Sequence, residues 1–354
     1  MNVGFLSIGK KYVDEREAEI ALFDSGYDAT MFMTIVDEKS IEWAYSQMRL
    51  VCDALVIEGD IEKFYTAIGE ELASKPSSYE RDGKIFGVTQ KATDAYLCDE
   101  FIPMLNGKSN LRYDVVTYKT YGKTVDELKA MLKDLTKKRS RVAIGYYPAL
   151  GEVEVHIRCS NKMPKADLND LSDKFYALLS GCSYASCRIT IAERVAQMLT
   201  EQNLKLKIAE SFTGGALAAA LTAIPGASKF LEEVLVTYNV RSKIRRLGIP
   251  AQSIAEYGVV SGETAYNMAA GLLVSGDCDV VVSTTGNAGP TVDGNAGTVG
   301  HCYIGYGNKY GIGTPDYKFD GDRSDVIESG VKTALFRLYE YLRQRQSMLE
   351  QNNH

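Results

Sequence analysis

The sequence predicts an α/β protein with more than one domain, and two observations carry this prediction. The 354 residues exceed the roughly 250 to 300 at which a single hydrophobic core stops growing. In addition, short apolar runs alternate with segments of helical periodicity, which is typical of a parallel sheet covered by helices. In the N-terminal part, strands are predicted at residues 2–8, 27–34 and 53–58 and helices at 13–25 and 41–52.

The remaining elements divide the chain into three blocks. A Pro/Ser/Gly-bearing break at 75–83 and a strand at 84–88 close the first block near Asn110. The second block has the pattern of a small α+β module, with strands at 115–121, 141–147 and 152–159 and helices at 124–135 and 165–179. The third block starts with a helix at 189–202, a strand at 204–209 and a small-residue helix at 216–223.

Composition and charge exclude several classes of protein. The net charge of −6 argues against a nucleic-acid-binding surface, because phosphate neutralisation needs a concentrated basic face. The one short basic cluster, 137–141, is interpreted as a solvated linker. The N-terminus lacks the apolar region of an export signal, and no apolar stretch approaches the ~20 residues needed to cross a bilayer. We therefore expect a cytoplasmic protein without membrane spans.

Histidine and cysteine usage limits the possible chemistry. The seven cysteines are scattered and lack C-x-x-C spacing, so we expect reduced thiols and no metal site. Only three histidines exist, and His354 is the last residue, which leaves little for a Ser-His-Asp triad. Any hydrolytic chemistry here needs a different base.

The most informative stretch is 209–215, which lies between the predicted strand and the small-residue helix. Ser211 at such a turn, followed by Gly214 and Gly215, is held where backbone N–H groups and the helix N-terminus face a ligand. That geometry suits a nucleophile beside an anion site. The alternative is a glycine turn that only allows close packing of strand and helix, as in many doubly wound proteins.

A candidate base follows about thirty residues later, where Tyr238 and Lys243 are five positions apart. A desolvated lysine has a lowered pKa and can act as general base toward a serine hydroxyl, with a tyrosine assisting the proton transfer. The alternative is that Lys243 is one of several cations on an exposed helix, together with Arg241, Arg245 and Arg246.

Two further segments complete the candidate site. A valine-rich strand runs from Cys278 into a hydroxyl- and glycine-rich loop, and ligands of open α/β sheets bind at such carboxyl ends. Its candidate residues are Thr284, Thr285, Gly286 and Gly289, unless the loop is only a tight turn. Near the C-terminus, Ser324 or Asp322 can cap a helix at 324–343, so a structural role is expected for Asp322. Arg323 places a positive charge at the start of that helix, where the helix dipole disfavours it. An anionic ligand bound near Arg323 would compensate this charge.

These segments together resemble the CinA-like protein family, whose C-terminal domain is known as nicotinamide-nucleotide amidohydrolase. The family's A-E-S-C-T-G-G motif corresponds to 209–215, with Phe212 at its fourth position. The Y-S-N-E-A-K, T-G-I-A-G-P, G-T-V and G-D-R motifs correspond to 238–243, 285–290, 297–299 and 321–323, and 224–228 is a further match. Within 238–243 the tyrosine and lysine are kept, and Ile327 stands where the family usually carries a second arginine.

The resemblance implies hydrolysis of the carboxamide of nicotinamide mononucleotide to nicotinate mononucleotide and ammonia, in pyridine nucleotide salvage. Ser211 would attack the amide carbon, Lys243 would accept its proton with help from Tyr238, and Arg323 would hold the phosphate. Donors to the oxyanion or ligand would come from Thr213, Gly214 and Thr285, with Gly215, Gly286 and Gly289 completing the substrate-binding set. No metal or cofactor is implied, and family precedent predicts a homodimer.

The resemblance also predicts the domain organisation. Residues 1–110 would form a degenerate MoaB/MogA-like α/β domain, 111–183 a KH-type α+β module, and 184–348 an α/β/α deamidase domain. The first domain has Lys10 and Lys11 in place of an acidic pair, and residues 57–63 replace a T-G-G-L-G-P-T loop that would grip phosphate. We therefore expect the family's pyrophosphatase activity to be lost.

Two hypotheses about function follow. The first is an active amidohydrolase. The second is a catalytically silent nucleotide-binding or scaffold member, favoured by the changed N-terminal motifs and by the substitutions around the retained side chains. Nucleic-acid binding through the KH-like module is disfavoured, because the usual G-x-x-G loop is absent from 115–179 and the chain is acidic.

Overall fold

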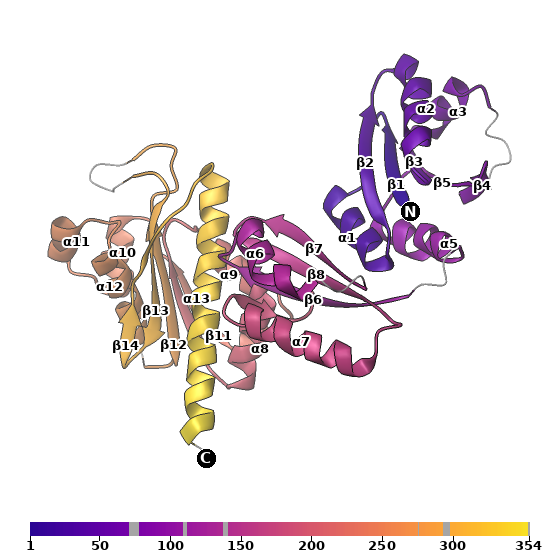
Figure 1. Cartoon of the computed structure of the whole chain (residues 1–354). Coiled ribbons are helices and arrows are strands. Elements are labelled where there is room, and N and C mark those ends of the chain that lie inside the picture. Colours follow the sequence, from indigo (N-terminus) through magenta and orange to yellow (C-terminus); the bar gives the residue numbers. More distant parts are fainter. Residues whose placement is uncertain (71–77, 109–111, 137–140, 275, 293–297, 353–354) are drawn as a thin grey trace. The chain divides into compact units, whose positions relative to one another are not determined.

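The computed structural model describes residues 1–70, 78–108, 112–136, 141–274, 276–292 and 298–352 (Figure 1). The α/β fold class is confirmed, because the described residues form three sheets with helices between their strands. Contacts divide it into two compact units. Unit 1 comprises Met1–Thr117, Val125–Tyr147 and Glu154–Leu179, and unit 2 comprises Tyr118–Thr124, Pro148–Val153 and Ser180–His354. The division into domains at 110/111 and 183/184 stays a prediction, and residues 109–111 lie outside the described residues.

The N-terminal sheet has the strand order β2-β1-β3-β5-β4, parallel except for β4. Its strands are β1 Asn2–Ile8, β2 Asp28–Ile35, β3 Ala54–Gly59, β4 Ser78–Arg81 and β5 Lys84–Thr89. Its helices are α1 Glu15–Ser25, α2 Ile41–Val51, α3 Ile61–Ala67, α4 Asp94–Tyr96 and α5 Ile102–Asn106, with helical turns at Glu38–Ser40 and Leu97–Phe101. Alternate side chains of β1 and β3 enter two separate cores, one on each face, so the sheet is covered on both sides. The predicted parallel-sheet layer is confirmed. The predicted break at 75–83 falls partly outside the described residues, and β4 begins within it.

A buried glutamate closes the carboxyl edge of this sheet. Glu58, near the end of β3, accepts hydrogen bonds from Ser7 Oγ at 2.6 Å and from the backbone N–H groups of Tyr12, Val13 and Ala92 at 2.9, 3.1 and 3.0 Å. A carboxylate from within the chain therefore uses donors that an anionic ligand would otherwise contact.

The middle sheet has the order β7-β8-β6-β9 and contains both strands of the predicted hairpin. Its elements are β6 Tyr113–Tyr121, α6 Val125–Thr136, β7 Val142–Ala149, β8 Glu152–Ser160, α7 Lys165–Leu179 and β9 Ser183–Ala185. The three strands and two helices predicted in this range agree with the observed elements to within a few residues. The basic cluster interpreted as a linker, 137–141, lies outside the described residues apart from Arg141.

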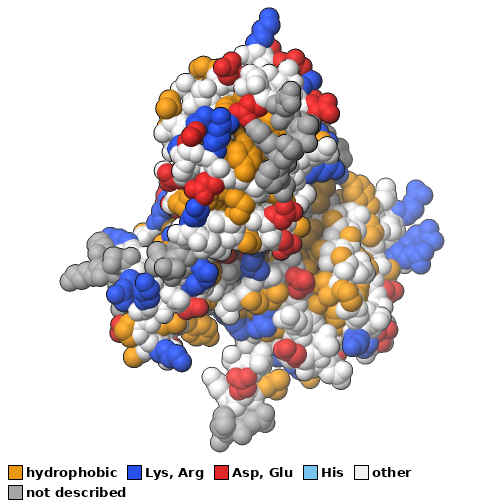
Figure 2. Space-filling model, turned by 90° about the vertical axis from the view of Figure 1, so that its right-hand side faces the viewer, with side chains coloured by type: hydrophobic (Ala, Val, Ile, Leu, Met, Phe, Trp, Pro, Cys, Tyr) orange, Lys and Arg blue, Asp and Glu red, His pale blue; other side chains and the backbone are white. Residues whose placement is uncertain are grey.

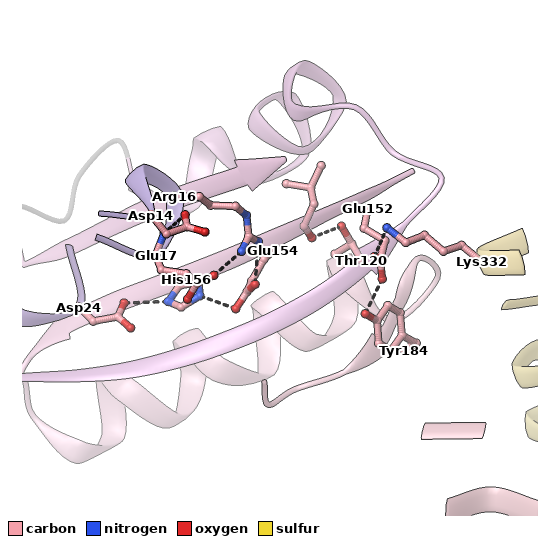
Figure 3. Close-up of polar contacts among 11 residues, drawn as sticks. Asp14, Arg16, Glu17, Asp24, Thr120, Glu152, Glu154, His156, Tyr184 and Lys332 are labelled. Atoms are coloured by element: carbon pink, nitrogen blue, oxygen red, sulfur yellow. Dashed lines mark hydrogen bonds and ion pairs between the residues drawn. The ribbon is translucent and has the colours of Figure 1, made fainter. Parts of the chain in front are cut away.

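Polar contacts organise β8, as Figure 3 shows. In unit 1, the buried His156 ring lies between two carboxylates, with Nδ1 2.7 Å from Asp24 and Nε2 2.9 Å from Glu154, which also pairs with Arg16. Burial lowers the pKa of His156, but the hydrogen bonds to Asp24 and Glu154 outweigh it and raise the pKa above the ordinary value. In unit 2, Glu152 accepts from Tyr184 Oη and pairs with a lysine of the last helix.

The C-terminal sheet has the order β11-β10-β12-β13-β14, with β15 pairing with β13. Strands β11, β10 and β12 are parallel, and β13 is antiparallel to β12. The strands are β10 Leu206–Glu210, β11 Leu231–Val236, β12 Val280–Gly286, β13 His301–Asn308, β14 Gly311–Gly313 and β15 Asp316–Lys318. The helices are α8 Ile191–Glu201, α9 Ala216–Thr222, α10 Val240–Leu247, α11 Ala251–Tyr257, α12 Gly262–Leu273 and α13 Arg323–Asn352, with a helical turn at Ala227–Lys229.

Helices cover both faces of this sheet (Figure 1). Leu206, Ile208 and Val280 pack with α8, α9 and α13 on one face, while Ala209 and Val281 pack with α10, α11 and α12 on the other. The predicted α/β/α layering is thereby confirmed. Residues 297–305 also have the sequence pattern of a strand, and β13 begins within them, at His301; Gly297 lies outside the described residues.

Two negative findings apply to the described residues. None of their helices has the length and apolar character needed to span a membrane, and no group of three or more His, Cys, Asp or Glu side chains comes together as a metal-ligand set. On the face drawn in Figure 2, basic and acidic side chains are interspersed rather than gathered by sign.

Candidate active site

Ser211 follows directly after β10, at the carboxyl edge of the C-terminal sheet. Its backbone N–H donates to the Thr284 carbonyl of the neighbouring β12 at 3.0 Å, which fixes the start of the turn against the sheet. The Ser211 side chain is buried. The serine therefore lies at the sheet edge where open α/β folds bind their ligands, as the sequence predicted.

Two glycines let the chain turn from β10 into α9. Gly214 and Gly215 have φ values of 61° and 102°, which side chains with a Cβ rarely adopt. The turn is held on one side by the Gly214 N–H, which donates to the Ser211 carbonyl at 3.1 Å. The glycine pair therefore serves to reverse the chain tightly behind Ser211.

The N-terminus of α9 does not face a ligand, which corrects the sequence prediction. The fully buried carboxylate of Glu210 accepts the N–H of Gly215 at 2.8 Å, of Leu217 at 3.2 Å and of Ala218 at 2.8 Å. These are the groups that a helix leaves free at its start. Sequence reasoning gave Glu210 no role, although a carboxylate just before a glycine turn is the signal that could have suggested a helix cap.

Two other N–H groups of the turn stay free. Among the described residues, no acceptor is found for the backbone N–H of Phe212 or of Thr213. The Thr213 side chain, by contrast, is engaged, because its Oγ1 lies 2.7 Å from Thr284 Oγ1. The donors available beside Ser211 are thus backbone groups of the two residues that follow it.

Lys243 points inward from α10 and is fully buried. Asn239 caps the helix by accepting the Arg241 N–H at 2.9 Å, and Lys243 lies one turn further on. Its Nζ is 2.8 Å from Ser211 Oγ, 2.7 Å from the Thr237 carbonyl oxygen and 3.4 Å from the Tyr238 carbonyl oxygen. The exposed-face alternative holds only for Arg241, Arg245 and Arg246, whose side chains are exposed.

Burial changes the acidity of this lysine. Desolvation lowers the pKa of Lys243 to about 8, because the ammonium form loses its hydration and has no carboxylate partner among the described residues. The free amine is therefore present near neutral pH. Lys243 Nζ donates to the Thr237 and Tyr238 carbonyl oxygens and to Ser211 Oγ. An amine has one N–H fewer than an ammonium group, so the free amine can keep both carbonyl contacts and turn its lone pair to Ser211 Oγ.

A cavity of about 670 Å³ opens at Ser211. That volume lies within the range of ligand-binding pockets. Of the residues predicted from the sequence, the cavity is lined by Ser211, Tyr238, Gly286, Gly289 and Arg323. Other parts of its wall come from residues that the sequence did not single out, such as Asn239, Tyr257 and Asn287.

The other predicted residues are not among those that line the cavity. Gly214 and Gly215 shape the turn and use their N–H groups internally. Thr285 Oγ1 donates to the Val259 carbonyl at 2.7 Å, which joins β12 to the segment before α12. The hydroxyls expected to face a ligand are thus engaged in holding the scaffold.

Arg323 bridges two sides of the cavity mouth. Its Nη2 donates to Tyr238 Oη at 2.9 Å and its Nη1 to the Gly289 carbonyl at 2.6 Å. Asp322 caps α13 by accepting the N–H groups of Ser324 and Asp325, as predicted. The guanidinium group stays exposed beside the cavity, so it presents positive charge where an anionic group of a ligand would enter.

Two of the departures from the family motifs, Phe212 and Ile327, lie at one apolar cluster. Phe212 is buried, and Ile327 packs against the apolar cluster that contains Phe212, Ala288, Cys302 and Val326. Ile327 is not among the residues that line the cavity. The Ile327 side chain therefore contributes to the apolar packing around Phe212, in the turn after β10.

Comparisons with known proteins find relatives of the region that holds this site. Residues 188–342 match the family model of the CinA C-terminal domain. The chain is 33% identical over 211 residues to a "Putative competence-damage inducible protein" of Caldicellulosiruptor saccharolyticus, covering 59% of this chain and 51% of that protein. It is 32% identical over 246 residues to a "CinA-like protein" of Citrifermentans bemidjiense, covering 70% of this chain and 59% of that protein.

Among solved structures, the chain is similar to the competence-damaged protein (CinA) superfamily protein from Enterobacter cloacae, with 31% identity over 45% of this chain and 96% of that chain and a TM-score of 0.42. The aligned regions span about half to three-fifths of the length of the curated relatives named above.

Fold and site define an α/β domain with a buried serine–lysine pair at the carboxyl edge of its sheet. The family match covers this domain and includes all the residues that form the pair and the cavity. The domain at residues 188–342 belongs to the family of CinA C-terminal domains.

Proposed function

We propose that this chain hydrolyses the carboxamide of nicotinamide mononucleotide to nicotinate mononucleotide and ammonia. The observation that carries the proposal is the 2.8 Å contact between the buried Lys243 Nζ and Ser211 Oγ, at the wall of a nucleotide-sized cavity. A hydroxyl nucleophile needs a nearby base with a pKa close to working pH, and burial supplies one in Lys243.

Acylation uses both members of the pair. The free amine of Lys243 accepts the Ser211 Oγ proton as Oγ attacks the carboxamide carbon. The resulting tetrahedral oxyanion is placed to accept hydrogen bonds from the unengaged N–H groups of Phe212 and Thr213. When the C–N bond breaks, Lys243 returns the proton to the departing NH₂ group, so ammonia leaves and an ester joins Ser211 to the nicotinoyl group.

Deacylation reverses the proton path. A water molecule attacks the ester carbon while Lys243 accepts one of its protons. The C–Oγ bond then breaks, and Lys243 gives the proton back to Ser211 Oγ. The sum is one carboxamide and one water converted to one carboxylic acid and one ammonia, with the pair regenerated.

Binding of the nucleotide is assigned to the mouth of the cavity. Arg323 would pair with the phosphate through its planar fork, in place of its contacts with Tyr238 Oη and the Gly289 carbonyl. Tyr238 would then be free to approach the pair, where its hydroxyl assists proton transfer. Gly286 and Gly289 line the cavity and allow the ligand to approach the backbone closely.

We also propose the organisation expected from the sequence: a degenerate MoaB/MogA-like domain at 1–110, a KH-type module at 111–183 and the deamidase domain at 184–348, acting as a cytoplasmic homodimer. The buried Glu58 supports the loss of pyrophosphatase activity in the first domain, because it already uses the donors at that sheet edge.

The test is ammonia release from nicotinamide mononucleotide by the full chain, measured beside Ser211→Ala and Lys243→Met. The parent is expected to turn over and both variants to lose activity by about 10³-fold or more while keeping their circular dichroism spectra. The Ser261→Ala variant, which alters a hydroxyl outside the cavity wall, is the control and is expected to keep its rate. Nucleotide binding by an inactive parent, seen by calorimetry, would replace the proposal with the silent-binder hypothesis.

A further inference from the structure

Glu210 is a buried charge that the proposed mechanism does not use. It is the last residue of β10 and the direct neighbour of Ser211, and its side chain is fully buried. No Lys, Arg or His side chain pairs with it among the described residues. A buried carboxylate without a cation needs hydrogen-bond donors to compensate its charge.

Those donors all come from one place, the start of α9. Oε2 accepts the N–H of Gly215 and of Leu217, and Oε1 accepts the N–H of Ala218. The partial positive charge of the helix N-terminus thus compensates Glu210. These hydrogen bonds also constrain the shape of the turn, because the Glu210 side chain joins the residue before Ser211 to the residues that end the turn.

Hydrogen bonds therefore fix both the first and the last residue of the turn. Its entry is fixed by the Ser211 N–H on the Thr284 carbonyl at 3.0 Å, and its exit by the Gly215 N–H on Glu210 at 2.8 Å. Between these two contacts, Gly214 donates to the Ser211 carbonyl. The N–H groups left without an acceptor among the described residues are those of Phe212 and Thr213.

We propose that Glu210 is a positioning residue of the active site: it takes the N–H groups of α9 and so holds the turn in the one shape that leaves the Phe212 and Thr213 N–H groups free for the oxyanion. This inference rests on the proposed function and adds a residue to it. Glu210 acts through the backbone of the turn and touches neither the substrate nor Lys243.

The first test replaces the carboxylate by an amide of the same size. In Glu210→Gln the amide NH₂ faces a backbone N–H where an oxygen stood, so a donor meets a donor and the turn must shift. We expect kcat for nicotinamide mononucleotide to fall by about 10- to 100-fold, with KM changed by less than about threefold, because the oxyanion forms only in the transition state.

The matched control is Glu193→Gln. Glu193 also caps a helix start, by accepting the Thr190 N–H at 2.7 Å and the Thr190 hydroxyl at 2.9 Å in α8. Losing that cap should change thermal stability and leave kcat unchanged. A Glu210→Gln variant that folds and keeps the parental kcat would overturn the inference, as would an equal loss of kcat in both variants.

A second measurement uses the unaltered full chain, in case Glu210→Gln does not fold. Amide hydrogen exchange resolved to single residues should find Gly215, Leu217 and Ala218 protected and Phe212 and Thr213 exchanging much faster. Equal protection of the two groups would overturn the inference. If the parent chain releases no ammonia, the proposed function fails, while the exchange pattern still decides the arrangement around Glu210.

Discussion

At the scale of single residues, the decisive feature is that Lys243 is held by two carbonyl oxygens and by no carboxylate of the described part of the chain. The Thr237 and Tyr238 carbonyls accept N–H groups from its Nζ but do not favour the ammonium form as a full negative charge would. Burial therefore governs, and the pKa of Lys243 falls to about 8. The same contacts hold Nζ beside Ser211 Oγ. The buried position of Lys243 therefore accounts both for its lowered pKa and for its contact with Ser211.

This lowered pKa predicts the pH dependence of the reaction. The active form is the free amine, so kcat/KM should rise about tenfold per pH unit below pH 8 and level off above it. The sign follows because raising the pH removes the proton that blocks the base. Initial rates of ammonia release between about pH 6 and 9.5 check this. A rate that falls with pH through this range would contradict the role of Lys243.

Sequence reasoning found Ser211, Tyr238, Lys243 and Arg323 but could not decide the state of Lys243. The neighbouring arginines made an exposed helix the favoured interpretation of this segment taken alone, and only the packing of α10 against the sheet settles which cation turns inward. Glu210 and the N–H groups of Phe212 and Thr213 were missed, because their roles depend on which hydrogen bonds are already made, and a sequence does not list those.

At the scale of elements, the turn after β10 is supported from α13. A Cβ added to Gly330 would lie 2.4 Å from Phe212 Cζ, so the absence of a side chain at this helix position makes room for the ring. Phe212 in turn carries one of the free N–H groups beside Ser211. The helix that presents Arg323 at its start thus also sets the position of the nucleophile turn.

Gly330→Ala tests this support. Alanine usually stabilises a helix by about 1 kcal/mol relative to glycine, but here the overlap with Phe212 must displace the ring and the turn with it. We expect a loss of about tenfold or more in kcat/KM and a lower melting temperature. The control is Gly262→Ala in α12, where an added Cβ meets nothing nearer than 3.4 Å. Unchanged rates in Gly330→Ala would show that the turn does not depend on α13.

The elements themselves could largely be predicted from the sequence. Periodicity placed β1, α2, α7 and α8 within a few residues, because each has a strong apolar pattern and flanking turn signals. The short elements α3, α11, β14 and β15 were not predicted, since few residues define them and tertiary packing decides their conformation.

At the scale of the whole molecule, unit 2 includes pieces of the middle sheet. Tyr121 Oη lies 2.6 Å from Thr333 Oγ1 of α13, its ring stacks on Phe336, and Glu152 pairs with Lys332 at 3.1 Å. The ends of β6 and of the hairpin therefore belong to the packing of the C-terminal unit. Local sequence patterns could not predict these contacts, because Tyr121 and Thr333 are 212 positions apart in the sequence.

Tyr121→Phe measures how much the contact between Tyr121 and Thr333 contributes to the free energy of unfolding. The change keeps the ring and removes the hydrogen bond to Thr333, so we expect the free energy of unfolding to fall by about 1 kcal/mol. Thermal or urea unfolding of the full chain provides the measurement. Tyr310→Phe, at an exposed ring, is the control and should be neutral. Equal stability of the two variants would contradict a contribution from this contact.

Turnover of nicotinamide mononucleotide in the presence of hydroxylamine tests whether Ser211 is the nucleophile. An ester on Ser211 can be attacked by this amine as well as by water, so we predict that the hydroxamate of nicotinate mononucleotide forms beside the acid, and that Ser211→Ala gives neither. Ammonia release with the acid as sole product, persisting in Ser211→Ala, would contradict a serine nucleophile at this site.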